Sequence, residues 1–503
     1  MYRPVSYTHL DVYKRQVPLS WTAPIRLVII YAAVHFILKW LSGRKIVLRD
    51  QPGKLNWKFG GVIFLISAGI LGLYYAAYYP GGICSDSFNQ WYQVEDGYLL
   101  DWHPAIHTFL FLKLPSLICE SLSFVNLAQL IWISLASAYL AMTMEKWGIR
   151  KRWCIIATAL AIGNPASSTI LSFCWKDTAL TIFVMVLTAQ VMEVVCTEGK
   201  SLHDWRNLLC LAVSGGLASL MRHNGILLVG PLLVLMVLIC WKKAGKRSLL
   251  AGILTLAVIA GIKGPVYRVL HVQSHPQVSA EMLGVPMTIL ANVLVNEPEL
   301  LDEECREFMY RIGDQALWEE KYREGSWNSA KWMGDDISNE VMEEVGAANI
   351  LKYTWHAVLR APYLSYRAAV KLFEVVWKPG GSEVAWSYHV NVDENNIYGM
   401  VTGGVPALQK ILDTVHDWST KGGVLLTWFW YTGFYILLLL FAGLSQLKKG
   451  FAKCLYWVPV MAYNFGTALL LCGSDFRFFA FNTVVTFPMV LMILGERRSE
   501  AEE

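Results

Sequence analysis

An aspartate follows a helix-breaking stretch in the first fifth of the sequence. An apolar run is followed by Pro80, Gly81 and Gly82, which favour the end of a helix, and then by Asp86. A carboxylate at the start of a new helix can act as a general base or as a ligand of a divalent metal ion. Alternatively, Asp86 or Ser85 caps the new helix, since both side chains accept hydrogen bonds from free N–H groups. Residue chemistry leaves both interpretations open.

Two further polar motifs occur where apolar runs begin. His103 precedes Pro104, which is favoured in the first turn of a helix. An imidazole there can bind a phosphate or orient a carboxylate, and the alternative is a solvated histidine. Lys176 and Asp177 follow Trp175. The alternative for this motif is a Trp–Lys anchor at the membrane interface with a capping aspartate.

An arginine joins two apolar runs near the middle of the chain. Arg222 is followed by His223 and Asn224. A guanidinium is planar and matches a phosphate with two parallel hydrogen bonds. The alternative is a buried ion pair between Arg222 and Asp177 or Asp86.

The last polar motif consists of Asp475 and Arg477 and precedes the final apolar run. As an alternative to a role in a functional site, these two residues form a local ion pair.

The sequence contains no phosphate-binding loop, no zinc-protease motif and no Gly-x-Ser-x-Gly motif. An ATP-driven pump and a serine esterase therefore have no support. The ten cysteines form no Cys-x-x-Cys pair and are interpreted mainly as small core residues.

The composition indicates a membrane protein. Of 503 residues, 55% are hydrophobic and only 16% are charged, against about 25% charged in soluble domains. The 21 tryptophans fit a chain that meets membrane interfaces. The net charge of +4 is small, and the basic residues form short clusters between apolar runs. This pattern excludes a disordered chain and argues against a soluble enzyme or a nucleic-acid partner.

Eleven apolar runs approach the length of about 20 residues that a span needs. We therefore predict an all-α polytopic membrane protein with about 11 transmembrane helices and external juxtamembrane helices. The predicted spans are 22–41, 57–79, 124–144, 154–173, 178–196, 207–221, 226–241, 248–265, 424–445, 454–472 and 478–495. Asn164 and Pro165 predict a kink in the fourth span.

Basic residues set the orientation of these spans. Six clusters of Lys and Arg fall on alternate loops, at 44–54, 146–152, 200–206, 242–247, 448–453 and 497–498. Because short cytoplasmic loops are rich in Lys and Arg, all six are predicted to be cytoplasmic. The polar motifs described above then share the opposite face. Charges near membrane spans are costly unless they serve a purpose, so we expect these motifs to converge on one external site.

The chain is expected to divide into four parts. Residues 1–16 resemble a translated sequencing adapter and are interpreted as a cloning artefact. Residues 17–265 form a membrane domain with an external catalytic loop at 80–123. Residues 266–423 form an external segment with interfacial helices, and residues 424–503 form C-terminal spans and a cytoplasmic tail. The runs 104–119 and 355–378 mix charged and apolar residues and are predicted to lie at the interface.

With these motifs in this order, the chain resembles the GT-C superfamily of integral-membrane glycosyltransferases. Within it, the chain is similar to bacterial polytopic proteins placed near the protein mannosyltransferases and aminoarabinose transferases. The resemblance covers most of the chain from about residue 57. It rests on the loop 80–91, on His103-Pro104, on 175–177, on 220–225 and on 475–478.

The resemblance implies a sugar donor linked to a polyprenyl phosphate and a glycan, lipid or protein acceptor of the cell envelope. It places the reaction at the external face of a bacterial plasma membrane. It implies that Asp86 is the base or the ligand of Mg or Mn and that Asp177 orients the acceptor or assists the metal. The donor phosphate would bind Arg222, Arg477, His103 and Lys176, and the substrates would contact His223, Asn224 and Asp475.

Three departures from the superfamily pattern stand out. The first loop has one Asp instead of an adjacent acidic pair, which weakens the case for a metal. Phe478 stands where a Tyr is common, and an extra span precedes the usual first one. The main rival function is a transporter or flippase of a lipid-linked or anionic solute, but the sequence has few charges within the spans and no internal repeat. A second rival is an assembly factor whose segment 266–423 binds partners.

Overall fold

The structure is a computed structural model that describes residues 22–44, 46–274, 278–331, 333, 337–378, 388–421 and 427–497. The interpretation of residues 1–16 as an artefact concerns residues outside these ranges. The same holds for Lys45 and Arg498 of the basic clusters.

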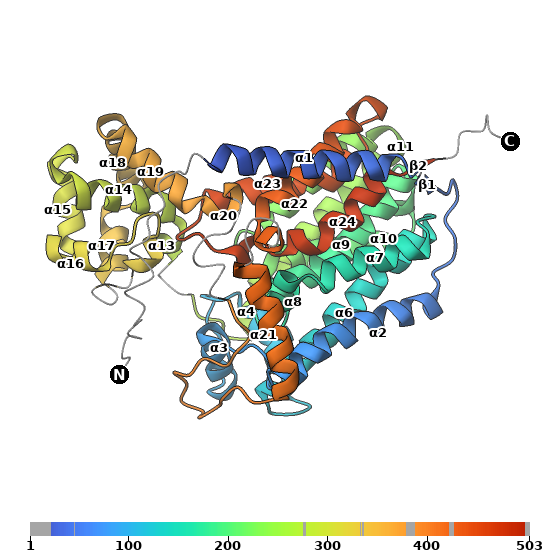
Figure 1. The fold of residues 1–503 in the computed structure, drawn as a ribbon, viewed down its shortest axis with the longest axis horizontal. Coiled ribbons are helices and arrows are strands. Elements are labelled where there is room, and N and C mark those ends of the chain that lie inside the picture. Colours follow the sequence, from blue (N-terminus) through green and yellow to red (C-terminus); the bar gives the residue numbers. More distant parts are fainter. Residues whose placement is uncertain are drawn as a thin grey trace.

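A bundle of long apolar helices forms the body of the protein and lies nearly horizontal in Figure 1. Its helices are α1 (Thr22–Ser42), α2 (Trp57–Ala77), α6 (Leu122–Lys146), α7 (Lys151–Ile162), α8 (Pro165–Leu171), α9 (Lys176–Thr197), α10 (Trp205–Leu220), α11 (Ile226–Gly261), α22 (Thr432–Ser445), α23 (Cys454–Ala468) and α24 (Phe481–Leu494). Among the described residues, five helices are long and apolar enough to span a membrane, or six if α7 and α8 form one bent span. The all-α polytopic fold is confirmed, and the count of about 11 spans stays a prediction.

Helix α11 is a hairpin of two antiparallel halves. Its backbone leaves the helical region at Ala244, where φ is −150° and ψ is 25°. A Cβ added to Gly215 of α10 would lie 3.6 Å from Val229 and 3.4 Å from Thr255. A straight helix would separate these two residues by about 39 Å, so the chain must reverse between them. The structure thus matches the predicted pair of runs at 226–241 and 248–265.

The predicted kink at Asn164 and Pro165 is confirmed. Helices α7 and α8 meet there at 65°. Proline cannot donate the hydrogen bond that would continue α7, and the Asn164 side chain caps α8 by accepting from the Ala166 N–H at 2.9 Å.

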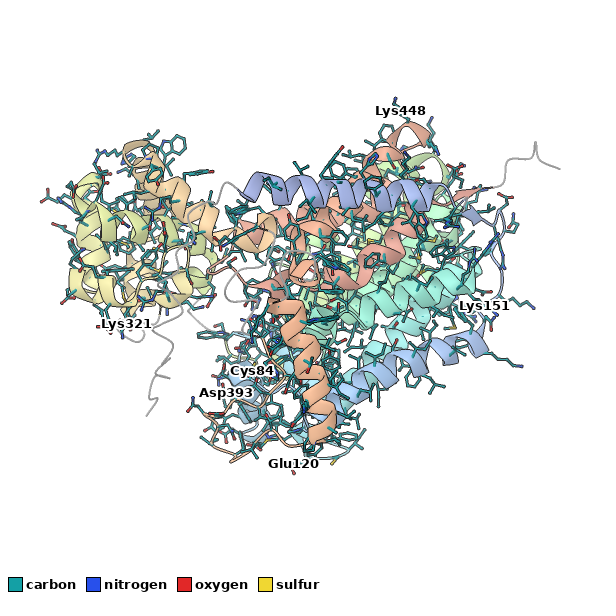
Figure 2. All side chains as sticks on the ribbon, viewed as in Figure 1. Cys84, Glu120, Lys151, Lys321, Asp393 and Lys448 are labelled. Carbon is teal, nitrogen blue, oxygen red and sulfur yellow. The ribbon has the colours of Figure 1, made fainter. Side chains whose placement is uncertain are left out.

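The predicted basic loops gather at one end of the bundle. Strands β1 (Val47–Leu48) and β2 (Glu496–Arg497) pair in parallel there, and the Arg49 N–H donates to the Trp147 carbonyl at 2.9 Å. Arg497 also pairs with Glu198 at 3.7 Å. Figure 2 shows Lys151 and Lys448 toward this end. The prediction that these loops share one face is confirmed, and this face is called the basic end below.

The opposite end carries short helices and a loop. These are α3 (Ser85–Glu95), the consecutive turns α4 (Ala105–His107), η1 (Thr108–Lys113) and α5 (Leu114–Ser116), and α21 (Pro406–Lys421). The predicted run 104–119 is therefore helical but too short to span. Residues 388–405, called the covering loop below, lie against α3, where the Phe88 and Tyr398 rings stack at 5.5 Å.

A helical subdomain with its own core projects from the same end (Figure 1). Its elements are α13 (Val278–Met282), α14 (Gly284–Asn296), α15 (Glu303–Ile312), α16 (Gln315–Lys321), α17 (Ile337–Val345), α18 (Ala347–Arg360) and α19 (Pro362–Leu372), followed by α20 (Glu374–Trp377). Its core includes Met287, Trp318 and Trp327. Both ends of the subdomain contact the segment before the last polar motif. Cys472 donates to the Glu281 carbonyl at 3.3 Å, and the Val375 N–H donates to Ser474 at 2.8 Å.

The loop before α3 depends on a glycine that has no room for a side chain. Gly81 has a φ of +98°, and a Cβ there would overlap the Asn126 amide nitrogen. Gly97 has a similar φ of +75° but faces open space. Gly97→Ala should cost about 1–2 kcal/mol, the penalty of the left-handed conformation. Gly81→Ala should cost clearly more, as measured by unfolding in detergent. Equal losses in the two variants would contradict the steric argument.

Candidate active site

The Asp86 carboxylate faces basic side chains from two distant segments. Helix α3 begins at Ser85, and Cys84 stands at its N-cap without a side-chain capping bond. The Oδ2 atom of Asp86 lies 3.1 Å from an Arg477 guanidinium nitrogen and 3.5 Å from Lys176 Nζ. The alternative in which Ser85 or Asp86 caps α3 is therefore wrong, because the carboxylate is directed toward these cations.

The backbone before Asp86 is fixed on both edges. The Gly82 N–H donates to the Ser172 carbonyl, and the Cys174 N–H donates back to the Gly82 carbonyl, both at 3.0 Å. Ile83 pairs with the covering loop, accepting from the Asp393 N–H at 2.8 Å. A carboxylate three residues later is thereby held in place by two different parts of the chain.

His103 lies between Asp86 and Lys176. Its Nδ1 atom is 2.9 Å from Lys176 Nζ, and its Nε2 atom is 4.0 Å from Asp86 Oδ1. An ammonium group can only donate, so Nδ1 accepts and the ring proton is assigned to Nε2, facing Asp86. Burial and the Lys176 charge lower the pKa of His103 to about 3. The imidazole is neutral at physiological pH.

Arg477 connects Asp86 to a second carboxylate. Its Nε atom lies 2.9 Å from Asp475 Oδ2, and the same oxygen accepts a hydrogen bond from the Tyr388 hydroxyl at 2.7 Å. The predicted local pair of Asp475 and Arg477 is thus present, and Arg477 also reaches Asp86. Sequence analysis missed Tyr388 because nothing in its neighbourhood of the sequence indicates a contact 87 residues away.

Asp177 and Arg222 form a buried ion pair, so the structure favours the alternative interpretation of Arg222. Their side chains are 3% and 11% exposed. Phe478 lies between the two arginines, with its ring centre 4.4 Å from the Arg222 guanidinium and 5.2 Å from that of Arg477. Phe478, which stands where the superfamily commonly has a tyrosine, therefore makes cation–π contacts with both arginines.

The remaining predicted residues lie around this ion pair. Asn224 accepts from Arg222 Nε at 3.2 Å and donates to Thr467 at 2.7 Å, so both ends of its amide have protein partners. His223 is exposed, and its Nε2 atom lies 3.2 Å from the Trp102 carbonyl. The convergence of the predicted motifs is confirmed, with Asn224 and His223 at the margin.

The charges of the site compensate one another. Burial raises the pKa of Asp86, but Lys176, His103 and Arg477 lower it more, so this pKa lies well below its ordinary value. Asp86 is consequently ionised at neutral pH. It is also the most exposed member of its cluster, at 26% against 21% for Arg477 and 16% for Lys176. Part of the Asp86 side chain is therefore accessible from outside the cluster.

The donor set does not fit a divalent metal ion. Among the described residues, no three His, Cys, Asp or Glu side chains are grouped as metal ligands. Asp86 is surrounded by two cations and one imidazole, whereas Mg²⁺ prefers several oxygen ligands. These side chains instead offer hydrogen-bond donors to an anion.

One known family model matches part of the chain. Residues 91–289 match the family model described as dolichyl-phosphate-mannose-protein mannosyltransferase, a family of the GT-C superfamily. The matched range includes His103, Lys176, Asp177 and Arg222. No curated protein and no solved structure matches the chain. The resemblance to GT-C membrane glycosyltransferases is confirmed by the family match.

Breaking the buried ion pair should destabilise the fold. Arg222→Gln leaves the Asp177 charge unpaired and should cost about 3–5 kcal/mol. The double variant with Asp177→Asn removes both charges and should recover most of this loss. Lys243→Gln breaks an exposed pair with Glu198 and should cost no more than about 1 kcal/mol. Unfolding in detergent measures the stability of the wild type and of these three variants. A double variant as unstable as Arg222→Gln would contradict the pairing.

The lowered pKa of His103 predicts a specific pH dependence of stability. Its pKa falls from 6.5 in the unfolded chain to about 3, so the unfolded state binds the proton first as the pH drops. The stability that the neutral His103 side chain contributes is fully present above pH 6.5 and is lost progressively toward pH 3. At about pH 5 the loss should reach about 2 kcal/mol. His103→Gln should remove this part of the pH profile, and an unchanged profile would show that His103 titrates normally.

Proposed function

We propose, from the premise of a GT-C membrane glycosyltransferase, that the protein transfers a sugar from a polyprenyl-phosphate donor to an acceptor of the bacterial cell envelope. The reaction would occur at the external membrane face, opposite the basic end. The observation that carries this proposal is the contact of an accessible Asp86 carboxylate with Lys176 and Arg477. This pairing brings a base and anion-binding groups within a few ångströms of each other.

The proposed transfer uses Asp86 as the general base. An acceptor hydroxyl attacks the anomeric carbon of the donor sugar, and the bond from that carbon to the phosphate oxygen breaks. Asp86 accepts the hydroxyl proton. The polyprenyl phosphate leaves with one more negative charge, which Arg477 and Lys176 stabilise. No step of this scheme requires a metal ion, in line with the donor set at Asp86.

The low pKa of Asp86 fits this role once the donor is considered. Lys176 and Arg477 hold the carboxylate ionised in the free protein. A donor phosphate would attract the same two cations and share them with Asp86. Their hold on the carboxylate would weaken, and its basicity would rise when the acceptor is in place. Donor binding therefore prepares the base.

Arg222 is a second candidate for contacts with the donor phosphate. One terminal nitrogen of Arg222 pairs with Asp177 and its Nε atom donates to Asn224, which leaves the other terminal nitrogen for a phosphate. The guanidinium also faces Arg477 across the Phe478 ring. Asp177 then acts by positioning Arg222, since its side chain is 3% exposed. The proposed role of Asp177 is thus to orient a donor-binding group.

The decisive test compares Asp86→Asn with Asp96→Asn, a matched change of an exposed aspartate at the other end of α3. Asparagine cannot accept the proton, so Asp86→Asn should lower transfer by about 10²–10⁴-fold. Asp96→Asn should keep wild-type activity. Mass spectrometry of envelope glycans and polyprenyl-linked sugars from a complemented deletion strain measures product and donor.

Each outcome of this experiment has a clear meaning. Loss of one glycan sugar together with accumulation of its lipid donor supports transfer and identifies the acceptor class. Full complementation by a stably produced Asp86→Asn protein would sink the assignment of Asp86 as the base. An unchanged glycan and donor profile in the deletion strain would favour the transporter or the assembly factor.

A further inference from the structure

An apolar cavity opens near the basic end of the bundle, far from the site described above. Its volume is about 940 Å³, within the range of about 300–1,000 Å³ that is usual for small-molecule sites. The end of α9, the first half of α11 and the turn before α23 enclose it. Aliphatic side chains such as Val194, Leu238 and Leu455 form its walls.

Aromatic side chains line the same cavity. Trp241 is 65% exposed and Phe451 is 70% exposed. Exposed aromatic rings of this kind are enriched where membrane helices reach the lipid headgroups. Since the α11 hairpin turns at Ala244, only three residues after Trp241, this side of the cavity is expected at the headgroup level.

The charge around the cavity is predominantly positive. Its one acidic lining residue, Glu198, is paired with Lys243 and lies 3.7 Å from Arg497. Lys242 also lines the cavity, and Lys448 precedes the lining residue Gly450 by two positions. Within the described part of the chain, Lys242 and Lys448 make no ion pair or hydrogen bond. With no partner among these residues, both ammonium groups suit contact with an anionic headgroup.

We propose that this cavity is a binding site for one anionic phospholipid. The acyl chains would occupy the aliphatic interior, and the phosphate of the headgroup would contact Lys242, with Lys448 nearby. Basic pockets between membrane helices are known to bind such headgroups, and an attraction of this kind requires both the apolar volume and the unpaired cations. This site is separate from the Asp86 cluster and does not depend on the proposed transfer.

Native mass spectrometry of the full chain in detergent tests the proposal directly. The purified protein is titrated with phosphatidylglycerol and with phosphatidylcholine of identical acyl chains. We expect one phosphatidylglycerol to be retained in preference to phosphatidylcholine. Lys242→Gln should weaken phosphatidylglycerol retention about fivefold, the effect of one lysine near an anionic headgroup. Leu238→Trp fills the cavity and should reduce retention of both lipids.

Matched variants on the second half of the hairpin serve as controls. Lys246→Gln removes an exposed charge outside the cavity, and Leu249→Trp enlarges an exposed side chain there. Both should retain phosphatidylglycerol as the wild type does. Equal retention of the two lipids would overturn the proposal. So would wild-type retention in Lys242→Gln and Leu238→Trp, or equal weakening in the two controls.

Discussion

A charge at the edge of a membrane must be compensated within the protein, and the Asp86 carboxylate imposes this requirement on the whole fold. Its two cations come from the start of α9 and from the turn before α24, which are 90 and 391 residues away. The bundle must therefore bring α3, α9 and α24 together at one end. The same pairing that stabilises this arrangement keeps an ionised carboxylate and two cations in contact. Stability and the proposed chemistry therefore rest on one set of ion pairs.

The sequence predicted which residues meet, because hydropathy and basic clusters determine on which face each short motif lies. It did not predict how they pair. Arg222 could have paired with Asp177 or Asp86, and only the packing of the α10–α11 turn against α9 decides for Asp177. For the same reason, residue chemistry leaves the capping role of Asp86 open as an alternative. A local motif carries no information about a partner several hundred residues away.

For the fold, too, the sequence predicts some features and not others. Composition was sufficient for an all-α membrane protein, and the Asn164–Pro165 kink follows from the chemistry of proline alone. The hairpin in α11 agrees with the predicted runs because four basic residues interrupt an apolar stretch. The sequence predicts the helical subdomain only as interfacial helices within the external segment 266–423. Its separate core depends on contacts such as that between Trp318 and Trp327, which no periodicity reveals.

The subdomain leaves the bundle and returns to it at nearly the same place, since Glu281 and Val375 both contact residues 472–474. An element attached at one point behaves as an insertion, and insertions with neighbouring ends are readily tolerated by the host fold. Evolution could thus exchange this module between related proteins without disturbing the ion pairs around Asp86. The membrane bundle and the module can then diversify at different rates, one constrained by its buried charges and the other by whatever it contacts outside.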